Sequence, residues 1–397
     1  MSDLVARLLR DRVVVQAWGP SPDRVDPHAG ALAQFREHAA AGDWDAAFAL
    51  AGRHLAPPQV APSIRQAAFA AVQTAATNPA AMAALATRVD DGDVVAAALL
   101  LFACAAGGRP LDLARASPQL WSKSLWWAMD DCTPEQVQEM LRLLHPAMGE
   151  WRMTRHLAGI LDRTPARQPG DRFMDDISAD LQLAQAATGR ADALLVCVCG
   201  RFGRIGLHVN LFHRFAAGTA RHVLYLRGSI EGPYRDGIPP FGPGYGAVAA
   251  VVRDLAAALA IRHVGVYGHS GGGFPAARLG LELGARRIVV ASGTTRFSRV
   301  PETPADRAAA GRALAREIGA LIEERSGAGE MLCLFSGDYD EDRADAERLA
   351  GLPGVRLLPV AGNQHNVARQ LVADGRLGPI LAWAGGARDD LPIGRTP

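Results

Sequence analysis

The chain has 397 residues and a formal net charge of +1, with 21% charged residues. This length is sufficient for two hydrophobic cores, and the balanced charge, with no basic patch carrying interleaved aromatics, argues against a nucleic-acid partner. The N-terminal segment carries scattered charges and no apolar core of signal-peptide length, and no apolar run is long enough to span a membrane. We therefore expect a cytoplasmic protein. Its five cysteines fit that location and show no zinc spacing.

Residues 1–165 are rich in Ala and Leu and, apart from a short apolar run at 13–15, contain no convincing strand. Thr133 and Gln136 flank Pro134 in the pattern of a capping box, which predicts the start of a helix. No fixed repeat length is found, so we expect an all-α, repeat-like domain of helical hairpins. Such domains present surfaces for protein partners; the alternative is a packing or dimerisation role. Helical periodicity predicts helices at residues 31–40, 44–55, 64–76, 80–89, 94–106 and 135–145.

A Pro- and Gly-containing linker at residues 162–171 separates this region from a second domain, which we place at residues 174–386, with a C-terminal tail at 387–397. In the second domain, short apolar runs alternate with helical patterns, which predicts an α/β fold with a mostly parallel sheet and helices on both faces. The first strands of this sheet are poorly marked. The predicted strands are residues 193–199, 222–226, 264–267, 287–292, 330–336 and 355–360.

Glycine-rich loops follow two of these strands. The loop after residues 193–199 has neither the dinucleotide fingerprint nor a P-loop Lys-Ser/Thr, so a nucleotide cofactor is not expected. The loop at residues 227–246 is long, contains Gly and Pro, and is predicted to form a wall of the substrate pocket. Arg227, directly after a strand, is a candidate partner for an anionic group of the substrate.

The Gly-His-Ser-Gly-Gly sequence at residues 268–272 lies between a predicted strand and a helix that begins near Phe274. A Gly-x-Ser-x-Gly in this context is a nucleophile elbow, in which a sharp turn exposes the Ser270 hydroxyl above the sheet. Small residues are needed around the serine because larger side chains would clash. The backbone N–H of Gly271 lies at a helix N-terminus, where a developing oxyanion is favoured. We therefore predict that Ser270 is a nucleophile and Gly271 an oxyanion donor.

A serine hydroxyl needs a base to take its proton, and the base needs a carboxylate to orient it. Two polar clusters follow the strands at 330–336 and 355–360, and in open parallel sheets sites gather at that edge. The second cluster contains His365, the predicted base, since none of the other histidines follows the acid loop. The first cluster supplies the acid, with three candidates: Asp338, Asp340 and Asp342.

Ser270 in its elbow, followed along the chain by an acid loop and His365, resembles the α/β-hydrolase superfamily over about residues 174–386. The resemblance favours Asp340 as the acid, because it lies three residues past Gly337. It also implies a second oxyanion donor in the loop after residues 193–199, for which the backbone N–H of Arg201 is the candidate. Two features depart from the family. Cys199-Gly200 replaces the common His-Gly, and no long apolar lid occurs between Ser292 and Glu330, which argues against a lipase acting at lipid interfaces.

The resemblance implies acyl transfer through a covalent acyl-serine, with no metal or redox cofactor. We expect an ester or thioester hydrolase acting on a small-molecule or carrier-bound acyl substrate. An O-acyltransferase with the same triad, with a glycan-related acceptor, is one alternative. The other is a non-catalytic interaction protein that uses the hydrolase fold as a scaffold.

Overall fold

The computed structural model divides into two compact units. One comprises Met1–Ala17, Arg163–Phe173 and Ala179–Pro397, and the other comprises Trp18–Asp162 and Met174–Ser178. We call them the α/β unit and the helical unit. The structure describes residues 13–16, 29–55, 62–175, 179–186, 192–200, 203–219, 221–227, 237–238, 241–294, 303–325 and 329–391.

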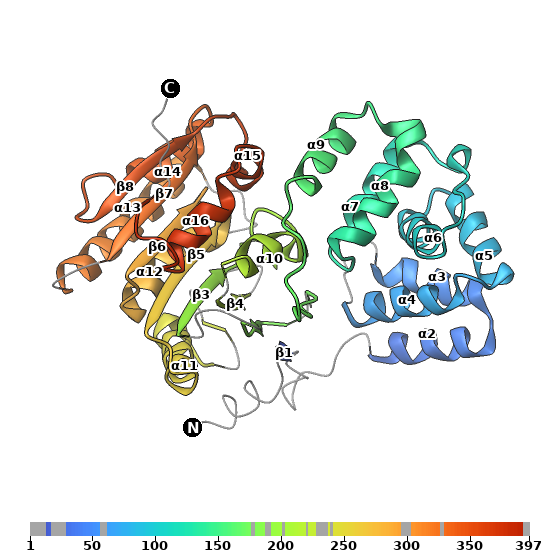
Figure 1. Cartoon of the computed structure of the whole chain (residues 1–397), viewed down its shortest axis with the longest axis horizontal. Coiled ribbons are helices and arrows are strands. Elements are labelled where there is room, and N and C mark those ends of the chain that lie inside the picture. Colours follow the sequence, from blue (N-terminus) through green and yellow to red (C-terminus); the bar gives the residue numbers. More distant parts are fainter. Residues whose placement is uncertain are drawn as a thin grey trace. The chain divides into compact units, whose positions relative to one another are not determined.

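The helical unit confirms every predicted helix of residues 1–165 and adds α7 and α9, which periodicity alone had not indicated (Figure 1). The predicted capping box is present, because the Thr133 side chain and the Gln136 side chain each bond the other's backbone N–H. The helices are α2 (Ala29–Ala41), α3 (Trp44–Leu55), α4 (Pro62–Ala75), α5 (Pro79–Asp90), α6 (Val94–Ala106), α7 (Pro118–Ala128), α8 (Pro134–Met148) and α9 (Arg152–Leu161).

Helix α6 forms the centre of the helical unit because it is apolar on every side. All its residues from Val95 to Cys104 are buried, and Asp93 caps its first N–H groups. Phe69 of α4 packs edge-on against Phe102 of α6 and stacks on Trp127 of α7. A helix that is apolar all round is stable only when other helices surround it, so this unit has a core of its own.

The α/β unit contains an eight-stranded sheet in its described residues, with the order β1-β2-β4-β3-β5-β6-β7-β8. Strand β2 is antiparallel to β1 and β4, and all other neighbours are parallel. This arrangement confirms the predicted mostly parallel sheet. The strands are β1 (Val13–Gln16), β2 (Leu181–Ala184), β3 (Ala193–Val198), β4 (His222–Leu226), β5 (His263–His269), β6 (Arg287–Ala291), β7 (Glu330–Ser336) and β8 (Val355–Val360).

The predicted domain limits need correction at three places. Strand β1 pairs with β2, so the all-α expectation for residues 1–165 does not hold for Val13–Gln16. The predicted linker at residues 162–171 lies almost wholly in the α/β unit, which includes Arg163–Phe173. The start of the predicted tail is also anchored there, because buried Arg287 of β6 contacts the backbone of Arg388 and the carboxylate of Asp389. In all three places the contacts join residues that are far apart in the sequence. Local sequence patterns do not predict such contacts.

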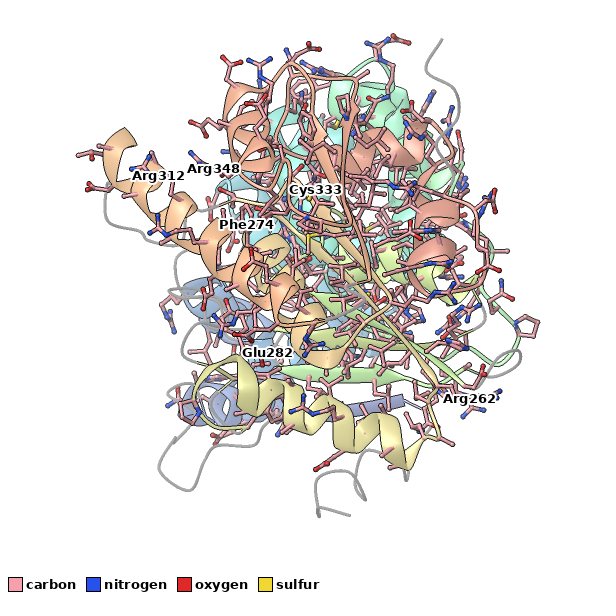
Figure 2. The ribbon with its side chains drawn as sticks, turned by 90° about the vertical axis from the view of Figure 1, so that its left-hand side faces the viewer. Arg262, Phe274, Glu282, Arg312, Cys333 and Arg348 are labelled. Atoms are coloured by element: carbon pink, nitrogen blue, oxygen red, sulfur yellow. The ribbon has the colours of Figure 1, made fainter. Side chains whose placement is uncertain are left out.

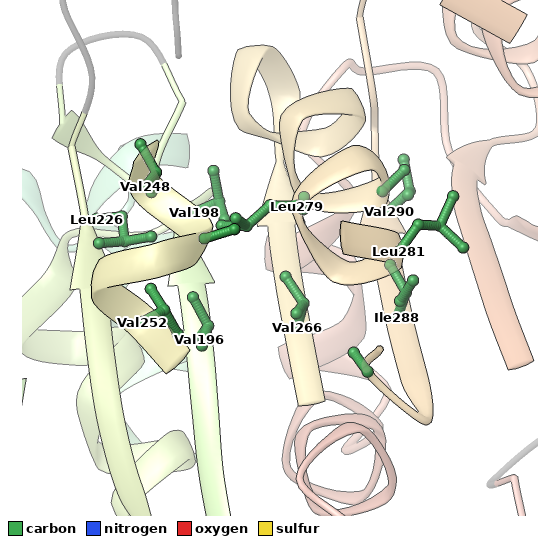
Figure 3. Packing of buried hydrophobic residues seen from close by; sticks show 14 of the residues in the cluster. Val196, Val198, Leu226, Val248, Val252, Val266, Leu279, Leu281, Ile288 and Val290 are labelled. Carbon is green, nitrogen blue, oxygen red and sulfur yellow. The ribbon is translucent and has the colours of Figure 1, made fainter. Parts of the chain in front are cut away.

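Helices cover both faces of the sheet. Successive residues of a strand point to opposite faces, so Val196, Val266 and Ile288 pack with one set of helices and their neighbours with the other (Figure 3). The first set is α11 (Gly244–Ala258), α12 (Gly273–Leu283) and α13 (Pro304–Glu323), whose apolar residues belong to the same core cluster. The second set, which packs against strands β4 to β8, is α10 (Val209–Ala217), α15 (Val367–Ala373) and α16 (Leu377–Ala384).

Helix α13 lies between β6 and β7 in the chain and packs on α12. It begins after Thr303, which forms a capping box with Asp306. Arg348, just after α14 (Asp340–Glu347), lies against Gly311 of α13 beside Arg312 (Figure 2) and pairs with Asp345 of α14.

Candidate active site

The nucleophile elbow forms where β5 ends. Ser270 has a φ of +54°, a left-handed conformation that few non-glycine residues adopt, and a single 3-10 turn (Ser270–Gly272) leads into α12. A Cβ on Gly268 would collide with Gly272 and Ala276, and one on Gly272 would lie 2.7 Å from the carbonyl oxygen of Cys199. Packing therefore requires both glycines of the motif.

A continuous set of hydrogen bonds joins Ser270, His365 and Asp342. Ser270 Oγ lies 2.7 Å from His365 Nε2, and His365 Nδ1 lies 2.6 Å from Asp342 Oδ1. Since a carboxylate only accepts hydrogen bonds, the ring proton is on Nδ1, and Nε2 is left to accept from the serine hydroxyl. The Asp342 side chain is 2% exposed and that of His365 is 36% exposed. The acid is thus shielded from water, whereas the base is partly open to it.

The carboxylate that contacts His365 is Asp342, whereas the sequence favoured Asp340 for this position. Asp340 is 86% exposed and pairs with Arg343 on the surface. The reason is that α14 begins at Asp340 itself, so that Asp340 and Asp342 both lie in its first turn. Each helical residue turns the side chain by about 100°, so Asp342 points about 200° away from Asp340 and back toward the sheet.

The three hydrogen-bonded residues follow along the chain in the order Ser270, Asp342, His365, and each comes after the C-terminal end of a parallel strand. This order, together with the strand-turn-helix geometry at Ser270, decides the fold family. The α/β unit has the α/β-hydrolase fold.

Two buried serines hold the loop that carries the base of this hydrolase fold. At one end, Gly362 O accepts from Ser336 Oγ at 2.5 Å and from the Asp338 N–H at 3.0 Å. At the other end, the Val367 N–H donates to Ser292 Oγ at 3.3 Å. Asp338, one of the three acid candidates, therefore contributes its backbone to the site. Sequence reasoning missed both serines, although each stands at or just past the C-terminal end of a predicted strand.

The loop after β3 lies against the elbow. A Cβ on Gly200 would lie 2.6 Å from the carbonyl oxygen of His269 and 3.3 Å from the Gly271 nitrogen. Gly271 is buried at the start of the turn into α12, where the first N–H groups of a helix have no partner within it. Arg201, the second predicted oxyanion donor, lies outside the described residues.

Arg227 is hydrogen-bonded to this loop and is not exposed for contact with a substrate. Its side chain is buried and donates to the carbonyl oxygens of Gly203, at 3.3 Å, and Ala179, at 3.2 Å. The sequence-based suggestion that Arg227 meets an anionic substrate group is therefore not supported by its position.

His269, the residue before the nucleophile, is a buried neutral imidazole. Burial, aided by the nearby charges of His365 and Arg369, lowers the pKa of His269 to about 3. It therefore stays uncharged at neutral pH, although its ring centroid is 6.1 Å from that of His365.

Within the residues that the structure describes, no group of three or more His, Cys, Asp and Glu side chains is arranged to hold a metal ion. In the same part of the chain, no helix combines the length and apolar character needed to cross a membrane.

No protein-family model matches the chain, and no curated protein matches it significantly. Among solved structures, it is similar to a 2,6-dihydroxy-pseudo-oxynicotine hydrolase at 13% identity and a TM-score of 0.40, covering 86% of this chain and 93% of that one. It is similar to the monoacylglycerol lipase of Paleococcus ferrophilus at 13% identity and a TM-score of 0.34, covering 49% of this chain and 95% of that one. It is also similar to Est1E of Butyrivibrio proteoclasticus with ferulic acid bound, at 12% identity and a TM-score of 0.38, covering 52% of this chain and 95% of that one.

Proposed function

We propose that the protein is a serine-dependent acyl-transfer enzyme that hydrolyses an ester or thioester through an acyl-Ser270 intermediate. The observation that carries this proposal is the pair of short hydrogen bonds from Ser270 Oγ through the His365 ring to the buried Asp342 carboxylate. A serine that served only as part of a glycine-rich turn would not require a histidine at its hydroxyl. It would also not require a buried carboxylate at the other nitrogen of that histidine.

In the first half of the reaction, Ser270 Oγ adds to the carbonyl carbon of the substrate while His365 Nε2 takes the hydroxyl proton. Asp342 stabilises the imidazolium that forms. The carbonyl oxygen becomes an oxyanion that accepts from the Gly271 N–H, with the Arg201 N–H as the second proposed donor. When the carbonyl re-forms, His365 returns its proton to the departing alkoxide or thiolate, and the acyl group stays on Ser270.

In the second half, His365 takes a proton from water, and the resulting hydroxide adds to the acyl carbon. Collapse of this second oxyanion returns the proton to Ser270 and releases the carboxylic acid. The partial exposure of the His365 side chain, 36%, favours water as the acceptor over an alcohol that must be bound in a dry pocket. An O-acyltransferase remains the alternative in which a bound alcohol takes the place of water.

Labelling with a fluorophosphonate tests the nucleophile. The wild type is expected to gain one phosphonyl adduct by intact mass, and Ser270→Ala and His365→Ala to gain none. Asp340→Asn is the matched control and should label as the wild type does, because Asp340 points away from His365. Labelling of Ser270→Ala, or a folded wild type that does not react, would contradict the proposal and favour a non-catalytic interaction protein.

Turnover of a series of acyl esters and thioesters, with and without added alcohols, then separates the two acceptors. A hydrolase releases free acid at a rate that alcohols do not change. Ester products that replace the free acid would identify a transferase.

A further inference from the structure

Asn366, the residue after the base, contacts two parts of the site at once. Its Oδ1 accepts from the Ala368 N–H at 3.2 Å and so caps α15. Its Nδ2 donates to the carbonyl oxygen of Gly206, in the loop after β3. Because an amide N–H can only donate and a carbonyl oxygen can only accept, these two partners fix which end of the Asn366 side chain faces which way.

Gly206 is packed so closely that no side chain fits between the loop and its neighbours. Its φ is +82°, and a Cβ there would lie 2.6 Å from Ala368 Cβ and 2.8 Å from His269 Nε2. The loop after β3 therefore rests directly on both the start of α15 and the residue that precedes the nucleophile. A shift of either partner must move Gly206.

Backbone hydrogen bonds inside the loop connect its residues to Gly200, beside the elbow. Gly200 N–H donates to Arg204 O at 2.8 Å, Gly203 N–H to Gly200 O at 3.2 Å, and Ile205 N–H to Leu207 O at 3.2 Å. Gly200 itself lies against the backbone of His269 and Gly271. The loop thus links Asn366 at one end to the proposed oxyanion site at the other.

We propose that Asn366 is a positioning residue that locks the loop after β3 to the segment carrying His365, so that the base and the oxyanion site keep one geometry. The cap alone does not explain this residue, because Ser and Asp cap helices as well as Asn does. Asp has no donor and Ser has a single oxygen, so of these three only Asn places an acceptor for Ala368 and a donor for Gly206 on separate atoms. The catalytic part of this inference rests on the proposed function.

The kinetic test uses Asn366→Ser and Asn366→Asp, which keep a capping oxygen but lose the donor to Gly206. We expect kcat to fall about 10- to 100-fold with KM nearly unchanged, since small misplacements at a reacting centre cost rates of this order. The temperature midpoint of unfolding should stay close to that of the wild type. If both variants matched the wild type and only Asn366→Ala lost activity and stability, the residue would be a helix cap alone and the inference would be wrong.

Hydrogen exchange tests the coupling without relying on turnover. In Asn366→Ser, the amides of Gly200, Gly203 and Ile205 should exchange about ten-fold faster. The matched control is Ser292→Ala, which removes the acceptor of the Val367 N–H in the same histidine loop. Among the described residues Ser292 has no hydrogen bond to the loop after β3, so these amides should not change.

Unchanged exchange in Asn366→Ser would overturn the inference whatever the activity. A wild type that does not label with fluorophosphonate, but whose loop responds to Asn366→Ser, would overturn the proposed function and support the coupling.

Discussion

At the scale of single residues, the site depends on where each polar group lies relative to water. His365 has one nitrogen on a buried carboxylate and the other on the Ser270 hydroxyl, which is the arrangement that a general base needs. The Asp342 carboxylate has its Oδ2 buried with no hydrogen-bond partner among the described residues. Its charge is therefore balanced mainly through His365, and the pair acts as one unit.

Substitution of the acid separates the two candidate aspartates. Asp342→Asn keeps the shape but places an amide beside His365 Nδ1, which favours the wrong ring tautomer. We expect kcat to fall about a thousand- to ten-thousand-fold, as in other triads of this kind. Asp340→Asn should stay within about two-fold of the wild type. Steady-state kinetics on an activated ester measure both, and an equal loss in the two variants would contradict the assignment of Asp342.

Burial of His269 makes stability depend on pH. The pKa of His269 is about 3 in the folded protein against an ordinary 6.5, so below pH 6.5 the unfolded chain binds a proton that the folded chain does not. Stability should therefore be complete above pH 6.5 and fall as the pH is lowered toward 3, by up to about 1.4 kcal/mol per pH unit from this residue.

Denaturant unfolding from pH 7.5 to pH 5 compares the wild type with His269→Gln, whose side chain has no charge to gain. The slope of stability against pH should be shallower in His269→Gln. Identical slopes would show that His269 does not cause the dependence.

At the scale of elements, close backbone contact determines the shape of the elbow. Gly272 touches the end of β3 so closely that the turn can form only without a side chain at this position. The same contact brings the loop after β3 to the nucleophile. The turn at Ser270–Gly272 is thus packed tightly between the end of β3 and the start of α12. This packing holds Ser270 at its positive φ.

A pair of glycine substitutions tests this packing. Gly272→Ala should destabilise the protein by about 2 kcal/mol or more, because backbone atoms of Val198 and Cys199 cannot give way to a methyl group. Gly378→Ala, in α16 with open space around its Cβ, should be neutral or stabilising by up to about 1 kcal/mol. Denaturant unfolding of the two variants and the wild type measures these changes in the free energy of unfolding. A mild effect at Gly272 would mean that β3 can move away from the elbow.

At the scale of the whole molecule, the chain contains two cores of different kinds. The helical unit surrounds the apolar helix α6, and the α/β unit buries strands from both faces. The proposed chemistry needs only the α/β unit, since Ser270, Asp342 and His365 all belong to it. The helical unit offers a surface for a protein partner as a proposal from its sequence, with packing or dimerisation as the alternative.

The sequence by itself determined the elements whose patterns are local. The apolar strands β3 to β8, the elbow around Ser270 and the capped helix start at Thr133 all followed from neighbouring residues. His365 was predicted from its order along the chain instead, because none of the other histidines follows the acid loop. These signals are local because packing of a strand or a cap requires particular residues at short, fixed spacings.

The tertiary structure decided what depends on residues far apart in the chain. It assigned β1 to the sheet, because β1 is held by pairing with β2 rather than by its own pattern. It chose Asp342 over Asp340, because the start of α14 sets which way each carboxylate points. It also brought Asn366 to Gly206 across 160 residues of sequence. Such contacts depend on the direction in which a side chain points and on the distance between segments in space. The spacing of residues along the sequence gives neither of these.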